Sequence, residues 1–186
     1  MHPPSHWALC QLGENFEEWL KIYYQEEDSY LILTAAEIDW AAGKTLWMGT
    51  LPSVDFSGLT PEETLSKRLI LQPTIHLFSL RGDFFTFREE FLKHEPEHYN
   101  THPFPEMSYG EHHFVLYRTP KNVLSWKEIT MAEFQMLSSF KEGHTIDGAC
   151  AEIEEKGGES FEEALSQIPF WFKQWTVLEW FGQSSS

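Results

Sequence analysis

The stretch HFVLYRTPKNVLSWKEITMAEFQMLSSFKEG, residues 113–143, decides the fold of this chain of 186 residues. It begins with two runs, 113–118 and 123–127, that are rich in β-branched, aromatic and other apolar residues. The turn-forming residues 119–122 separate them, and this pattern is typical of a β-hairpin. We therefore predict two antiparallel strands at this point of the chain.

Three capped helices are predicted after the hairpin. The first opens on a capping box, Thr130 to Glu133, and ends at Gly143; its inward residues are Phe134, Leu137 and Phe140. Thr145 caps the second, which we expect to end at residues 157–158.

A second capping box, Ser160 to Glu163, starts the third helix, and Pro169 should kink or end it. A terminal strand is predicted over residues 176–181. A hairpin followed by three short helices is the outline of a winged-helix unit, which we place at residues 111–182.

The preceding residues predict more helices. Phe16, Trp19, Leu20 and Tyr23 form the apolar stripe of one helix, and a denser apolar run predicts a second from 29 to 42, ended by Gly43. A third should begin at Pro61, and residues 68–78 are expected to be extended. The expected fold is α+β, with a mainly helical part at 1–91, a Pro/His-rich linker at 92–110 and the winged-helix-like part at 111–182.

Charge and composition exclude several function classes. Acidic residues exceed basic ones by 29 to 13, and the resulting net charge of −16 repels nucleic acid and anionic membranes. The two cysteines, Cys10 and Cys150, lie far apart outside any metal-binding motif, and the N-terminus lacks the pattern of a signal peptide. We expect a cytoplasmic protein that binds neither nucleic acid nor membrane.

No catalytic or cofactor motif is present, so we expect a protein that is not an enzyme and holds no cofactor. The best candidate for a metal site is His94, His98 and His102, whose spacing would align three imidazoles on one helix. Pro96 and Pro103 interrupt that helix, which favours solvated loop histidines. A metal-dependent enzyme using these histidines stays as an alternative.

The end of the chain, residues 170–181, is dense in aromatic side chains. Such a segment is more often core than a ligand-binding surface. An exposed aromatic patch that contacts a partner is the alternative, because one small core has limited room for large rings.

Two resemblances add to this picture. Residues 134–150, with the strands before them and 175–178 after them, resemble the PqqD-like winged fold, the recognition element that clasps ribosomally made precursor peptides. The upstream segments HPPS (2–5), LGENFEEWL (12–20), AEIDWA (36–41) and LQPTIHL (71–77) are similar to the HvfC/BufC family, first described as putative DNA-binding domain proteins. That family implies a partner subunit of multinuclear iron enzymes that modify such peptides. Its members usually carry a further helical domain ahead of the Pro-Pro segment, so the resemblance implies a fragment or a short member.

The expected function is therefore a non-catalytic partner that presents a peptide to an iron-dependent modifying enzyme. A peptide strand would add to the hairpin edge and contact the third helix. The candidate binding residues are Val115, Tyr117, Val123, Phe161 and Leu165, and the alternative is that all five only pack the domain. A winged-helix regulator that binds DNA is the rival function, which the acidic charge opposes.

Overall fold

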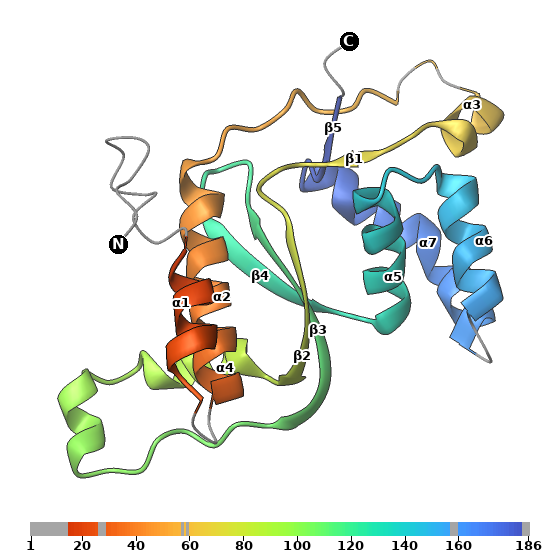
Figure 1. Ribbon diagram of the computed structural model, residues 1–186. Coiled ribbons are helices and arrows are strands. Elements are labelled where there is room, and N and C mark those ends of the chain that lie inside the picture. The colour runs from red at the N-terminus through yellow and green to blue at the C-terminus, as the bar shows by residue number, and fades with distance from the viewer. Residues whose placement is uncertain (1–14, 26–28, 57, 59, 157–159, 184–186) are drawn as a thin grey trace.

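The computed structural model describes residues 15–25, 29–56, 58, 60–156 and 160–183 and has a mixed α+β fold (Figure 1). A three-stranded sheet lies in the middle of the molecule. Helices from the first half of the chain cover one of its faces, and helices from the second half cover the other. The predicted α+β class is confirmed.

The sheet has the antiparallel order β2-β3-β4, with β2 at His76–Gly82, β3 at Tyr109–Arg118 and β4 at Leu124–Ile129. Strands β3 and β4 are the predicted hairpin, with Phe114 opposite Glu128 and Tyr117 opposite Ser125. Strand β2 comes from the predicted N-terminal part and pairs with β3, so that one sheet joins the two parts. Residues 113–117 of β3 are all buried because both faces of this central strand are covered.

The first layer contains α1 (Phe16–Tyr23), α2 (Ser29–Trp47) and α4 (Phe84–Phe91). Its core joins Ile38 and Ala41 of α2 to Phe84 and Phe85 of α4. The sheet contributes the alternate β3 residues Phe114 and Leu116 to this core, together with Phe78 and Leu80 of β2.

Two expectations for this layer are wrong. Helix α2 does not end at Gly43 but continues to Trp47, whose ring would lie 3.2 Å from a Cβ at residue 43. The predicted inward stripe of α1 is buried only at Leu20, whereas Phe16, Trp19 and Tyr23 are exposed.

The second layer contains α5 (Met131–Lys141), α6 (Ile146–Lys156) and α7 (Ser160–Val177). Local signals in the sequence set three of their boundaries. The Thr130 hydroxyl accepts a hydrogen bond from the Glu133 amide at 3.1 Å and so caps α5, and Thr145 caps α6 in the same way. Gly143, with φ at +87°, ends α5 as predicted.

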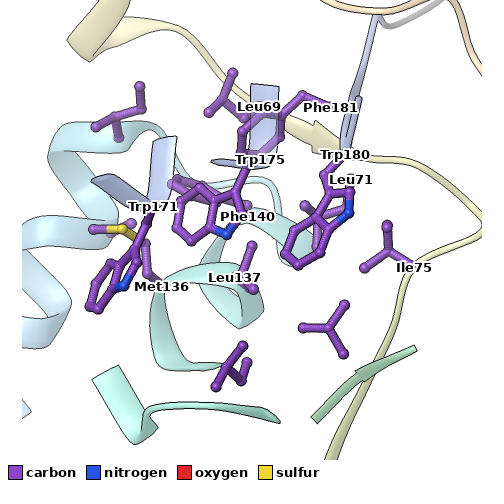
Figure 2. Close-up of a cluster of buried hydrophobic side chains, with 14 of the residues drawn as sticks. Leu69, Leu71, Ile75, Met136, Leu137, Phe140, Trp171, Trp175, Trp180 and Phe181 are labelled. Carbon is purple, nitrogen blue, oxygen red and sulfur yellow. The ribbon is translucent and has the colours of Figure 1, made fainter. Parts of the chain in front are cut away.

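The aromatic end of the chain lies in the core of this layer (Figure 2). Trp175 and Trp180 are fully buried, and Trp171 and Phe181 nearly so. These rings pack against Leu137 and Phe140 of α5, among other residues. The prediction that this segment forms core is confirmed for these rings, while Phe170 stays exposed.

Helix α7 corrects two further predictions. Of the two effects expected at Pro169, an end of the helix is wrong, because α7 continues to Val177. The terminal strand predicted over 176–181 is limited to β5 (Phe181–Gly182). Proline removes one backbone hydrogen bond, at a typical cost of about 3 kcal/mol. Burial of Trp171 and Trp175 on the helix beyond it offsets that cost.

Short elements complete the fold. β1 (Ile70–Leu71) pairs with β5 in a separate two-stranded sheet. Helix α3 (Pro61–Ser66) begins at Pro61 as predicted, and Thr60 and Glu63 form a capping box at its start. The predicted linker contains a 3-10 helix, η2 (Pro96–Asn100). Among the described residues no helix is long and apolar enough to cross a membrane.

Candidate functional site

The outer edge of β4 is one of the two unpaired edges of the three-stranded sheet in the described part of the chain. β4 pairs with β3 on one side only. The Thr119 amide donates to the Val123 carbonyl at 2.9 Å, which fixes the alternation of the antiparallel ladder. Counting onward in steps of two, the backbone groups of Ser125 and Lys127 face β3. Those of Leu124, Trp126 and Glu128 therefore point outward.

The opposite edge of the sheet, on β2, is more restricted. The same alternation turns the backbone groups of Leu77, Ser79 and Arg81 outward. The Arg81 amide already donates to the Tyr30 hydroxyl at 2.7 Å, so α2 closes that end. β4 thus offers the longer run of open backbone groups.

Helix α7 lies beside β4 and adds an apolar surface. Lys127 of β4 donates to the Gln174 side chain of α7 at 2.8 Å, which holds the two elements together. Phe170 lies about one helical turn before Gln174, and Val177 lies about one turn after it, so all three share one face of α7. The side chains of Phe170 and Val177 are 54% and 70% exposed. Both residues therefore share the helix face that contacts β4 through Gln174.

A buried ionic cluster fixes β4 against both helices. The Glu133 carboxylate is almost fully buried and accepts hydrogen bonds from the Trp175 indole at 3.0 Å and from Lys127 at 3.1 Å. A buried carboxylate needs such partners, because desolvation otherwise disfavours its charge. The Glu133 side chain thus binds across the core, and only the Thr130 half of the predicted capping interaction is seen. Sequence spacing indicated a cap at this position but gave no signal for this role.

The predicted binding residues fall in different environments. Val115 and Tyr117 are buried in the central strand, where both backbone edges are already paired. Burial also raises the pKa of the Tyr117 phenol. Neither side chain is accessible to a docked peptide.

The other three candidates lie elsewhere. Val123 is 55% exposed at the start of the β4 arm, and Leu165 is 43% exposed on α7. Phe161 lies in the first turn of α7, where its side chain is outside the described structure. The structure therefore does not bring the five candidates together, and β4 with α7 is the part of the predicted site that remains accessible.

The predicted histidine series forms a stack of rings rather than a chelate. The ring centroids of His94 and His98 lie 4.1 Å apart and those of His98 and His102 lie 4.0 Å apart, with nearly parallel planes. Metal ligation requires ring nitrogens that converge on one point, whereas parallel rings direct their lone pairs side by side. Slight desolvation and then the neighbouring His102 and His94 lower the pKa of His98. No group of three His, Cys, Asp or Glu residues in the described ranges is arranged to hold a metal ion.

Comparison with known proteins adds nothing to these observations: no protein-family model matches the chain, and no curated protein matches it either.

Proposed function

We propose that this chain binds an extended peptide as an added strand on β4. The observation that carries the proposal is the open β4 edge, where three residues direct backbone groups outward. Strand addition derives its affinity from main-chain hydrogen bonds and its selectivity from alternate side chains. The edge is held rigidly by the Lys127 contacts to Glu133 and Gln174, so little ordering is needed when a peptide docks.

The surroundings of the edge define the peptide. Side chains of an added strand alternate between the two faces of the sheet, and one set would contact Phe170 and Val177 of α7. We therefore expect apolar residues at every second position. The net charge of −16 favours a peptide that is neutral or basic overall.

The resemblances in the sequence extend this proposal to a role. In that role the chain is a non-catalytic, cytoplasmic partner of an iron-dependent enzyme, and the peptide is a ribosomally made precursor. The hairpin with α5, α6 and α7 is then a winged-helix-like peptide-recognition unit. Neither nucleic acid nor membrane is a partner in this role.

The DNA-binding alternative is disfavoured by local as well as total charge. Asp147, Glu154 and Glu155 are exposed on α6, the second of the three helices after the hairpin. A helix that enters a DNA groove has to approach phosphates, which these carboxylates repel.

Peptide selection followed by hydrogen exchange tests the proposal. Short random peptides displayed on phage are selected against the full chain, and amide exchange is measured by NMR with and without a selected peptide. Bound peptide should slow exchange at Leu124, Trp126 and Glu128. Protection confined to β2, or to no strand at all, would contradict strand addition to β4.

A proline scan of β4 provides the matched variants. E128P removes an outward amide and should weaken peptide binding at least about tenfold while the fold is kept. E128A, which loses the same side-chain contact to His112 but keeps the amide, should bind like the parent. S125P removes a ladder hydrogen bond to β3 and should destabilise the sheet. Parent-like binding by E128P would exclude the β4 edge as the docking site.

A further inference from the structure

A surface pocket lies at the start of β2, the edge strand opposite β4. Its volume is about 180 Å³. Helices α2 and α5 lie on opposite sides of β2 (Figure 1), and the pocket takes wall residues from all three elements. The sheet separates the two layers, so a pocket that both layers line has to lie at the margin of the sheet. The wall residues that matter here are Trp40 and Lys44 of α2, His76 and Leu77 of β2, and Lys141 of α5.

The two lysines of this pocket come from different layers but lie near the same side chain. The Lys44 ammonium lies 5.4 Å from the centre of the Trp40 ring, so a cation–π contact holds it at the pocket wall. Burial, and after it the charges of Lys141 and Lys44, lower the pKa of His76. Both ammonium groups therefore lie close enough to this imidazole for their charges to act on it.

The positive charge of the pocket is not neutralised by the described acidic residues. Within the described ranges neither Lys44 nor Lys141 forms an ion pair, whereas Lys93 and Lys127 each do. The carboxylate in the pocket wall, Glu37, is exposed, where solvent screens its charge. The chain has 29 acidic and 13 basic residues, so a pocket in which lysines outnumber carboxylates differs from the molecule as a whole. Such a pocket favours an anion.

We propose that this pocket binds the phosphate group of a small molecule, with the ammonium groups of Lys44 and Lys141 as its cationic donors. A lysine ammonium is a compact charge with three donors, and it is a common ligand of phosphate oxygens. Two of them match the charge of a phosphate monoester, about −1.5 to −2 at pH 7, better than the single charge of a carboxylate.

Size and charge limit the ligand further. Pockets for drug-sized ligands start at about 300 Å³, so this one takes a phosphate group with few further atoms. The net charge of −16 repels a polyanion such as nucleic acid along its whole length. A single phosphate interacts mainly with charges within the Debye length of about 8 Å, where the two lysines dominate. The site is independent of peptide docking on β4.

NMR titration of the full ¹⁵N-labelled chain tests this site. Inorganic phosphate is the probe, acetate is the singly charged comparison, and sodium chloride keeps the ionic strength constant. Phosphate should shift the backbone amide signals of His76 and Leu77, with a Kd on the order of 1–10 mM for so few atoms. Acetate should bind more weakly. The proposal is overturned if phosphate leaves both signals unchanged or if acetate binds as tightly as phosphate.

Charge variants locate the bound phosphate. K44M and K141M keep an apolar stem but remove one charge each, and each should weaken phosphate binding about fivefold. K93M removes the same charge outside the pocket and should have no effect. E37Q removes the carboxylate of the wall and should tighten binding. Parent-like binding by K44M and K141M, an equal loss in K93M, or weaker binding by E37Q would overturn the proposal.

Discussion

Helix α1 in the N-terminal layer and the C-terminal end of the chain, from α7 to β5, are both rich in aromatic side chains, but they bury them to different extents. In the C-terminal layer Trp175 and Trp180 are completely buried. In the N-terminal layer Phe16 and Trp19 of α1 are each 52% exposed, and Tyr23 is 68% exposed. Burial rather than ring content decides how much an aromatic residue stabilises a fold. The C-terminal layer should therefore supply most of the stability, and the N-terminal layer more of the apolar surface.

A pair of tryptophan truncations should show the largest difference. W175A removes a buried ring and a hydrogen bond to Glu133, and should lower the free energy of unfolding by about 3–5 kcal/mol. W19A removes a half-exposed ring and should cost less than about 1 kcal/mol. Urea unfolding followed by circular dichroism measures both. Equal losses would show that the two layers contribute alike.

The buried charge of the C-terminal layer should have the next largest effect. E133Q keeps an acceptor for the Trp175 indole but removes the charge that pairs with Lys127, and should cost about 1–3 kcal/mol. Adding K127M to E133Q should restore part of that loss, because no unpaired charge is left. A double-mutant cycle in urea measures this coupling. Strictly additive losses would show that the pair is not coupled.

A smaller, pH-dependent effect is expected where the two layers meet at the start of β2. Burial first, and then Lys141 and Lys44, lower the pKa of His76 from 6.5 to about 4. Lys141 belongs to the C-terminal layer and Lys44 to the N-terminal layer. Both line the surface pocket with His76, and Glu37 lies in the wall of that pocket as well. The unfolded chain therefore binds a proton on this imidazole at a higher pH than the folded chain does.

The sign of the effect follows from that difference. Stability due to the neutral His76 is complete above pH 6.5 and is lost as the pH falls toward about 4. With solvent screening, the loss should be about 1–2 kcal/mol. H76Q should show a flatter dependence over this range than the parent in urea unfolding at a series of pH values. Identical profiles would show that His76 titrates normally.

Local signals in the sequence predicted the elements whose boundaries are set locally. The hydroxyls of Thr60, Thr130 and Thr145 cap helices, and Gly143 ends one, because each acts on backbone within one turn. The hairpin was predictable for the same reason. These features can therefore be predicted from the neighbouring residues alone.

Features that depend on distant contacts were mispredicted or missed. Pro169 and Gly43 are helix breakers by local rules, yet each lies inside a helix that tertiary packing extends. The pairing of β2 with β3 crosses the predicted linker, and this pairing makes β3 central and buries Val115. For the candidate site, the sequence therefore indicated the hairpin and the third helix, but could not distinguish the open arm from the paired one.

The β1–β5 ladder has a consequence for the order of folding. It joins Leu71 to Phe181, and the Gln72 side chain donates to the Phe181 carbonyl across 109 positions of the chain. Closing so long a loop costs more entropy than forming a hairpin or a helix pair, and contacts of high sequence separation slow folding. The hairpin and the α5–α6 pair can form early, whereas this ladder has to wait for nearly the whole chain. The tryptophan beside it, Trp180, is therefore a probe for the last step of folding.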